Sequence, residues 1–139
     1  MSQAIYNAAS AYIGTKEIPG PSSNPQIKQW IAQAADWLDK DDSKTAWCGC
    51  FRGAIGLATG TGVPKAHYRA ASWAQWGKAV IPAHAQLGDT VVTTRKGGHH
   101  VGILHKITAD YVWLLGGNQS DAVTLARFPA SSILAIRRG

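Results

Sequence analysis

The two cysteines of the chain, Cys48 and Cys50, are the residues with the clearest chemical potential. They are separated by one residue, which is too close for an ordinary disulfide, and two thiols are too few for a zinc site. A helix predicted from about Thr45 to Ala58 puts Cys48 in its first turn, where unpaired N–H groups and the helix dipole stabilise a thiolate. Cys50 lies about 200° further around the same helix. The position makes Cys48 a candidate nucleophile, but by itself it favours a buried structural cysteine at both positions.

A thiol nucleophile requires a base, and the best placed histidines are the adjacent pair His99 and His100. They begin a predicted strand over 99–107, directly after a glycine turn at Gly97 and Gly98. Alternation along a strand sends the two side chains to opposite faces. The face of His99 is the more apolar one, so alternation leaves the choice between the two histidines open. The other histidines are predicted to lie on the surface or in packing: His67, His84 and His105.

The base in turn needs an acceptor that fixes its tautomer. Asn118 and Gln119 end the next predicted strand, which in a hairpin meander returns beside the start of the His100 strand. Either amide oxygen suits this role. Turn chemistry is the alternative, since the sequence Gly-Gly-Asn is typical of tight turns.

The elements that must position these side chains change in type along the chain. Apolar residues at helical spacing predict helices over 2–13, 25–38 and 45–58, the second with Asn24 as its N-cap. Glycines at three positions of the last helix indicate that it is pressed closely against a sheet: Gly49, Gly53 and Gly56. Period-two patterns then predict strands over 90–94, 99–107, 111–115, 122–128 and 132–137. Helices packed on an antiparallel sheet make an α+β fold, and residues 1–139 are expected to form a single domain.

Charge and composition narrow the classes of function. Fourteen Lys and Arg against eight Asp and Glu give a net charge of +6, which favours an anionic partner. The basic residues are scattered without a nucleic-acid-binding signature, so a basic surface is favoured over nucleic-acid recognition. No apolar run approaches the ~18 residues of a membrane span, and no signal-peptide pattern is present, which predicts synthesis in the cytoplasm. The aspartates near the end of the second helix lack the spacing of a calcium loop: Asp36, Asp39, Asp41 and Asp42.

With Cys48, His100 and Asn118 in this order, the sequence resembles the papain-like cell-wall hydrolases, namely the CHAP amidase/peptidase and NlpC-type groups. Within them it looks most like a CHAP-related family common in phage genomes. The resemblance covers nearly the whole chain and rests on seven segments in order: 13–20, 24–27, 46–51, 71–77, 87–92, 100–103 and 115–119. Two positions depart from the family pattern, since Ala46 stands where proline is usual and Cys50 where a small residue is common.

The resemblance implies a papain-like domain in which Cys48 is the nucleophile, His100 is the base and Asn118 orients the imidazole. The implied reaction is hydrolysis of an amide bond in the peptide stem of peptidoglycan, with no cofactor and no metal. Three further residues are expected to contact the substrate: Trp47, Glu17 and Trp73.

The expected partner is bacterial peptidoglycan, with no nucleic acid and no membrane span, and the protein is expected to be a monomer. Without a signal peptide it would reach the wall through a phage holin or a secretion machine. An endolysin therefore fits, and so does a secreted interbacterial amidase toxin with an immunity protein. A non-catalytic structural phage protein and a basic nucleic-acid-binding module are the alternatives from other classes.

Overall fold

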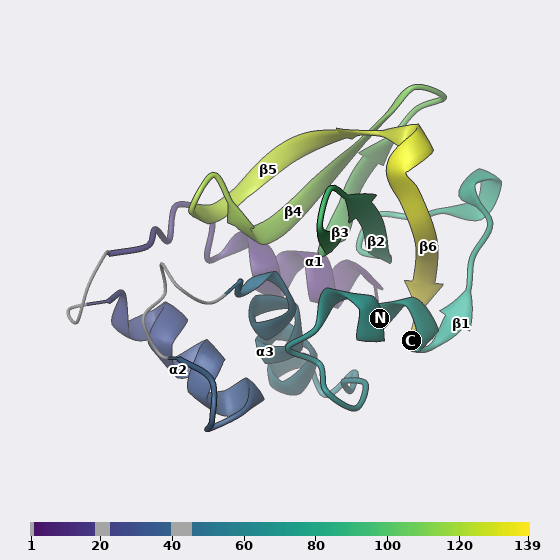
Figure 1. Ribbon diagram of the computed structural model, residues 1–139. Helices are drawn as coiled ribbons and strands as arrows, with labels where there is room; N and C mark the ends of the chain where they lie inside the picture. Colours follow the sequence, from purple (N-terminus) through teal and green to yellow (C-terminus); the bar gives the residue numbers. More distant parts are fainter. Residues whose placement is uncertain (1, 19–22, 40–45) are drawn as a thin grey trace.

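The computed structural model describes residues 2–18, 23–39 and 46–139, with helices first and strands second, as predicted (Figure 1). Its α-helices are α1 (Ser2–Ser10), α2 (Pro25–Ala34) and α3 (Cys48–Thr59). Its strands are β1 (Lys78–Ala79), β2 (Thr90–Arg95), β3 (Gly98–Ile107), β4 (Tyr111–Gln119), β5 (Ala122–Pro129) and β6 (Ile133–Arg138). Short 3-10 helices lie between them: η1 (Ala70–Gln75), η2 (Pro82–His84) and η3 (Ala130–Ser132).

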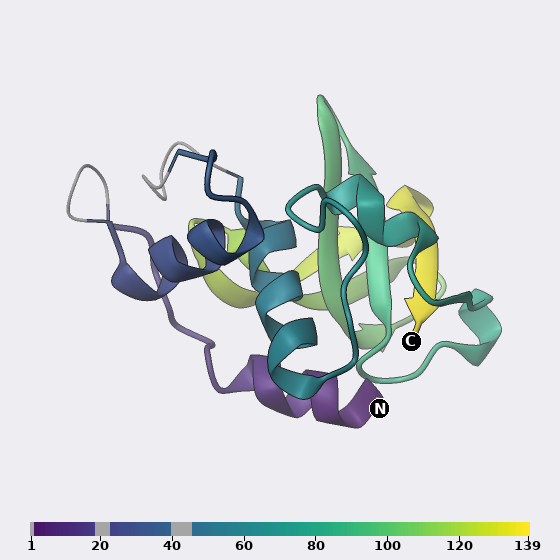
Figure 2. The ribbon, with the colours of Figure 1, turned by 90° about the horizontal axis from the view of Figure 1, so that it is seen from below.

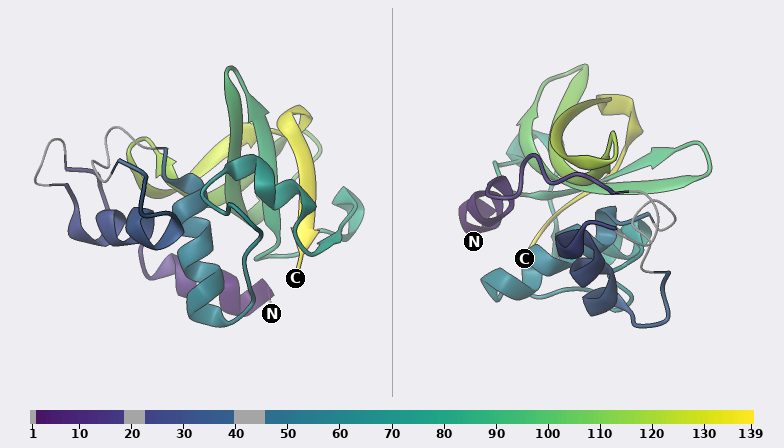
Figure 3. Two further views of the ribbon diagram at one scale, coloured as in Figure 1. Left: turned by 60° about the horizontal axis from the view of Figure 1, so that its bottom comes forward. Right: turned by 90° about the vertical axis from the view of Figure 1, so that its left-hand side faces the viewer.

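The strands form one antiparallel sheet in the order β1-β6-β2-β3-β4-β5. Consecutive strands from β2 to β5 are neighbours, which is the hairpin meander that the sequence predicts. Figures 2 and 3 show α1, α2 and α3 on one side of this curved sheet. The α+β architecture expected from the sequence is therefore confirmed.

The two faces of the sheet belong to separate apolar clusters. Val101 and Ile103 of β3 pack with the helices, whereas Leu104 packs on the other face. Leu114 of β4 belongs to the second cluster, and its side chain lies where a Cβ on Gly102 would fall, 2.9 Å from the leucine Cβ. Because side chains alternate along a strand, His100 projects from the face of β3 that points away from the helices.

The first two helices are shorter than the sequence predicts. After α1 the chain turns to pair with the sheet, since the Gly14 N–H donates to the Val123 carbonyl and Lys16 forms a bridge with Ala122. The α2 helix begins as predicted, with the Asn24 side chain accepting from the Gln26 N–H at 2.9 Å, and it ends at Ala34. Pairing with the sheet replaces the last predicted turn of α1.

The α3 helix ends as predicted, at Gly60, whose φ of 69° is the left-handed conformation that glycine adopts most easily. The glycines inside α3 serve a different neighbour from the predicted sheet. A Cβ at Gly49 would lie 2.6 Å from the carbonyl oxygens of His67 and Tyr68, and one at Gly53 would overlap the His67 ring. The segment 67–68 thus packs against the first turns of α3. No helix within the described residues is long and apolar enough to cross a membrane.

Candidate active site

Cys48 lies in the first turn of α3, as predicted, although the helix begins at Cys48 and not near position 45. Its side chain is buried, with 3% exposed. Trp47 precedes it as the N-cap and makes no side-chain capping bond. The N–H groups of this first turn therefore lack both an intrahelical acceptor and a side-chain cap. An anion at the Cys48 position is stabilised by these N–H groups and by the positive end of the helix dipole.

His100 reaches Cys48 through an opening between two strands. The β3–β4 ladder covers Ile103–Ile107 and Val112–Leu115, so the His100 end of β3 and residues 116–119 of β4 lie beyond it. The start of α3 packs into this opening, since a Cβ at Gly117 would lie 2.6 Å from the Trp47 ring and 2.8 Å from the Phe51 Cβ. The thiol comes from the helix side of the sheet and the imidazole from the opposite face, and they meet where the strands separate.

The environment of Cys48 favours its thiolate. Burial by itself raises the pKa of a thiol, but the hydrogen bond and positive charge of His100 act against it. The backbone of Val101 and the positive charge of Arg95 act in the same direction as His100. The net result is a pKa of Cys48 below its ordinary value, as an activated nucleophile requires.

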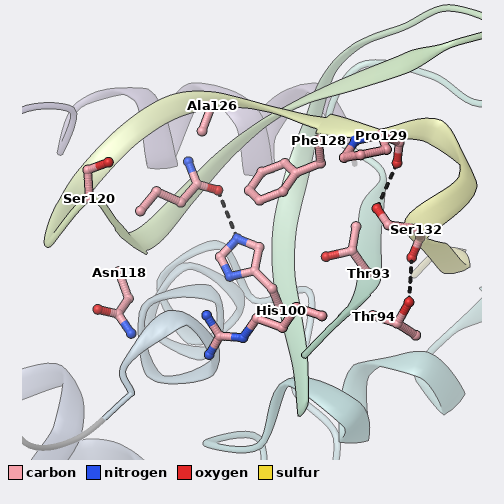
Figure 4. A pocket seen from close by; sticks show the side chains of 11 residues that line it. Thr93, Thr94, His100, Asn118, Ser120, Ala126, Phe128, Pro129 and Ser132 are labelled. Atoms are coloured by element: carbon pink, nitrogen blue, oxygen red, sulfur yellow. Dashed lines mark hydrogen bonds between the residues drawn. The ribbon is translucent and has the colours of Figure 1, made fainter. Parts of the chain in front are cut away.

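The acceptor on the other side of the imidazole is Gln119. Its Oε1 lies 2.8 Å from His100 Nε2, the bond drawn as a dashed line from the ring in Figure 4. The amide orientation follows from its other contacts, because Nε2 of Gln119 donates to the carbonyls of Leu114 at 3.2 Å and Thr124 at 2.8 Å. Oε1 must then accept from a protonated His100 Nε2, which leaves Nδ1 to face the thiol. Gln119 thus fixes the tautomer that a general base toward Cys48 needs.

Gly116 makes room for this hydrogen bond. A Cβ at position 116 would lie 2.5 Å from Gln119 Oε1 and 3.4 Å from His100 Nε2. Any side chain there would push the amide away from the imidazole. Gly116 was not singled out from the sequence, although the Gly-Gly pair before Asn118 is the signal that marks the close approach.

Asn118, the acceptor that the family resemblance favours, is not the imidazole's partner in this geometry. Its backbone is left-handed, with φ of 58°, and it lines a cavity beside His100 (Figure 4). The sequence leaves both Asn118 and Gln119 open as the acceptor, and the hydrogen bond belongs to Gln119.

Trp47 and Glu17 stabilise the start of α3, the helix that carries Cys48. Trp47 is fully buried, and its indole N–H donates to Glu17 Oε2 at 2.8 Å. A side chain with no exposed surface cannot touch a substrate, so the predicted substrate contact of Trp47 is corrected to a packing role. Glu17 is half-buried and holds the indole that precedes Cys48.

Trp73 is corrected in the same way. It is fully buried, and its indole N–H donates to the His67 carbonyl at 3.0 Å. The Arg52 guanidinium of α3 lies 4.4 Å from the Trp73 ring centroid and 5.1 Å from that of Trp76. These contacts fasten η1 to α3 and keep Trp73 away from solvent.

Two cavities flank the Cys48–His100 pair. One of about 430 Å³ is lined by residues of the sheet, among them Arg95, His100 and Asn118. Figure 4 shows the His100 ring in this cavity beside Phe128, on which it stacks with a centroid distance of 5.2 Å. The second, of about 270 Å³, holds the thiol and is lined by these residues: Ala46, Cys48, Tyr68, Arg69, Ala70, Ala71 and His99. Cys48 is among the residues that line this second cavity and does not line the first.

The remaining candidates lie elsewhere. His105 pairs through Nδ1 with the Tyr6 hydroxyl at 2.6 Å and does not line the cavity of Cys48. Asp36 and Asp39 follow α2, whereas Asp41 and Asp42 lie outside the described residues. In the described ranges, no group of three or more His, Cys, Asp or Glu side chains is placed to hold a metal ion.

Neither a protein-family model nor a curated protein sequence matches the chain. Solved structures do match its fold. The P60 domain of an antigen from M. avium paratuberculosis superposes with a TM-score of 0.61 at 11% identity, over 99% of this chain and 92% of that one. The peptidoglycan hydrolase RipB of Mycobacterium tuberculosis gives a TM-score of 0.62 at 16% identity, over 99% of this chain and 63% of RipB.

A third structural relative, RipD of Mycobacterium tuberculosis, is described as a non-catalytic NlpC/p60 domain protein adapted to peptidoglycan binding. It matches with a TM-score of 0.58 at 12% identity, over 99% of this chain and 95% of RipD. Together these structures confirm the expected NlpC-type papain-like fold for this chain. The TM-scores establish the fold. Sequence identities of 11% to 16% do not establish an activity, which must be argued from the residues of the site.

Proposed function

We propose that this chain, as one catalytic domain over residues 1–139, hydrolyses an amide bond in the peptide stem of bacterial peptidoglycan. The observation that carries the proposal is the arrangement of Cys48, His100 and Gln119. A thiol of lowered pKa lies at a helix N-terminus and is hydrogen-bonded to the imidazole of His100. The Nε2 atom of that imidazole is hydrogen-bonded to the amide oxygen of Gln119. The substrate class is supported by the fold shared with RipB, which is described as a peptidoglycan hydrolase.

In the proposed reaction, His100 Nδ1 takes the proton of Cys48, and the sulfur attacks the amide carbon to form an S–C bond. The oxygen that becomes negative accepts hydrogen bonds from N–H groups at the start of α3, including that of Cys48. The imidazolium then gives its proton to the leaving amine as the C–N bond breaks. His100 then deprotonates a water molecule, which attacks the thioester carbon, and the C–S bond breaks. The imidazolium returns its proton to the Cys48 thiolate, and the released acid loses its own proton to solvent to become a carboxylate.

The surroundings of the site suit an anionic substrate. The net charge of the chain is +6, and Arg69 and Arg95 line the two cavities beside the Cys48–His100 pair. Positive charge at a cleft raises the local concentration of an anionic polymer and speeds its encounter. Peptidoglycan stems carry free carboxylates, which is the property that this charge would select.

An endolysin and a secreted interbacterial amidase toxin share this chemistry, and we keep the endolysin as the first proposal. A monomer that reaches the wall with the help of a holin fits the lysin, and a neighbouring immunity gene would indicate the toxin. Lysis is tested by expressing the protein in bacteria with and without a periplasmic export signal and following the optical density of the culture. A fall in optical density identifies a protein that lyses cells.

A second candidate is peptidoglycan binding without hydrolysis. It is favoured by the burial of both reactive side chains, since Cys48 is 3% exposed and His100 is 2% exposed. RipD, with the same fold, is described as having this function. For catalysis, the substrate would have to reach the sulfur of Cys48, a residue with only 3% of its surface exposed.

Digestion of purified peptidoglycan, with product masses from chromatography and mass spectrometry, tests both candidates. Hydrolysis by the wild type that is lost in Cys48→Ala and after iodoacetamide, but kept in chelator, supports the cysteine mechanism. Co-sedimentation with peptidoglycan without any product supports the binding protein. Inhibition by chelator that added calcium or zinc reverses would contradict a metal-free mechanism.

A further inference from the structure

One tryptophan of the chain stands apart from the others. Trp37 is 68% exposed in the turn that follows α2. Of the other five, Trp113 is half-buried, and the remaining four are each at most 9% exposed: Trp30, Trp47, Trp73 and Trp76. An indole this open contributes almost nothing to the core, so its large apolar face is available to a ligand.

Trp37 contacts a residue that lines the cavity of Cys48. Its ring meets Tyr68 edge to face, at 5.2 Å between centroids and 88° between planes. Tyr68 in turn lines the cavity that contains Cys48, and the Arg69 guanidinium lies 5.8 Å from the Tyr68 ring. The edge-to-face contact leaves indole surface open to solvent beside the entrance to the thiol.

The backbone behind Tyr68 is held firmly. The Tyr68 carbonyl lies so close to Gly49 that a Cβ there would be 2.6 Å from its oxygen. Gly49 directly follows Cys48 in α3, so the backbone of Tyr68 packs against the same helix turn that carries Cys48. The Trp37–Tyr68 pair therefore has a defined position relative to the sulfur.

We infer that Trp37 and Tyr68 form a subsite for a sugar ring of the glycan strand that carries the cleaved stem. This inference rests on the proposed function. The C–H face of a pyranose is slightly positive and stacks on the negative face of an aromatic ring. An extended stem peptide spans about 3.3–3.6 Å per residue. A stem whose amide lies at Cys48 can therefore place its sugar at Trp37, which contacts the Tyr68 ring at the cavity of Cys48.

The subsite gives the enzyme a preference for stems that are still attached to glycan. Arg69, at the junction between Tyr68 and the thiol cavity, is placed to pair with a carboxylate of the same substrate. Sugar stacking and a charge contact on the same side of the sulfur would fix the direction in which the stem enters. Binding energy from the sugar is then available to position the amide at Cys48.

The test uses Cys48→Ala protein, which cannot turn over, with purified peptidoglycan sacculi and with the stem-free disaccharide released from them. Adding Trp37→Ala is expected to weaken sedimentation with sacculi about tenfold and to abolish binding of the disaccharide, whereas Trp37→Phe retains part of both. Tyr111→Ala is the matched control, because this aromatic residue is 38% exposed and lies roughly 20 Å along the sheet from His100. It is expected to bind as the parent does.

Activity assays complete the test. With Cys48 restored, Trp37→Ala is expected to lose activity on sacculi and to keep kcat/KM on free stem peptides. Equal losses on both substrates, or sedimentation equal to that of the Tyr111→Ala control, would overturn the inference, as would binding of DNA in place of the disaccharide. If no variant hydrolyses anything but Trp37→Ala still loses the disaccharide, the proposed catalysis fails while the sugar subsite stands.

Discussion

The two thiols of α3 are two residues apart and lie in opposite chemical environments. Cys48 faces a cavity and His100 at the first turn of the helix, and its pKa is lowered despite burial. Cys50 is fully buried, and burial, together with the negative charge of the Cys48 thiolate, raises its pKa to about 12. The same functional group thus has a lowered pKa at one position and a raised pKa at the other, and the largest lowering influence on Cys48 is the imidazole of His100.

The largest effect is expected from Cys48→Ala. We expect hydrolysis of peptidoglycan to fall by roughly 10⁴-fold or more, because the nucleophile and its base act as one unit. Rapid alkylation by iodoacetamide at about pH 6 should vanish with it, since only a thiol of lowered pKa is ionised there. Circular dichroism and thermal unfolding check that the variant is folded. Residual activity close to that of the wild type would show that Cys50 or another group is the nucleophile.

His100→Ala is expected to be nearly as severe, and it separates the two adjacent histidines. The variant loses the base as well as the hydrogen bond and charge that lower the pKa of Cys48, so fast alkylation should require a higher pH. His99→Ala should lower kcat/KM by less than about tenfold, because His99 lines the thiol cavity without meeting Gln119. The rate of alkylation as a function of pH measures both. An inactive His99→Ala with an active His100→Ala would mean that the assignment of the base is reversed.

Gly116→Ala and Gln119→Ala test the outer side of the imidazole. Both are expected to lower kcat by about 10- to 100-fold, the first by displacing Oε1 and the second by removing it. In both variants the Gln119 oxygen no longer fixes the tautomer of His100 that presents Nδ1 to Cys48. Asn118→Ala is the matched control and should retain most activity. If Asn118→Ala is the damaging change, the acceptor suggested by the family resemblance is the functional one.

The smallest effect is expected from Cys50→Ala, which should keep the fast alkylation and most activity at a stability cost of about 1 kcal/mol. The raised pKa of Cys50 means that its contribution to stability is fully present below pH 9.0, the ordinary thiol value, and declines as pH rises toward 12. The unfolded chain releases that proton more easily than the folded one. Each pH unit above about 9 then removes about 1.4 kcal/mol from the wild type, so its stability advantage over Cys50→Ala should fall and then reverse between about pH 9 and pH 11. Thermal unfolding at a series of pH values measures this. An advantage that stays constant or grows over this range would show that Cys50 ionises inside the fold at its ordinary pKa or below.

The sequence carries most of the fold because its signals are local. The Asn24 cap, the Gly60 end of α3 and the alternation of β2 to β6 each depend on neighbours within a few residues, and the structure contains all of them. The ends of α1 and α2 were placed too late. Pairing of residues 14–17 with the start of β5 is a contact across more than a hundred positions, which helix propensity does not register.

The glycines of α3 show the same division. Their number indicated that something packs closely on the helix, and this is correct. The helix does pack against β3 and β4, as predicted, but the direct neighbours of its glycines are His67, Tyr68 and Gly62. A small residue in a sequence reveals that space is needed, and only the three-dimensional packing reveals what occupies it.

The candidate site divides in the same way between local and tertiary information. Cys48 at a helix start and the His99–His100 pair at a strand start follow from the sequence, because helix termini and strand alternation are local properties. The choice of His100 over His99 comes from the family resemblance. The acceptor does not follow, since strict alternation puts residues 114, 116 and 118 on the His100 face of β4. An extra residue between Gly116 and Gln119, with Asn118 in a left-handed conformation, shifts that alternation by one and brings in Gln119. The sequence by itself determined which residue types stand at the ends of α3, β3 and β4, and the tertiary structure decided, through a bulge and an opening between two strands, which of them meet.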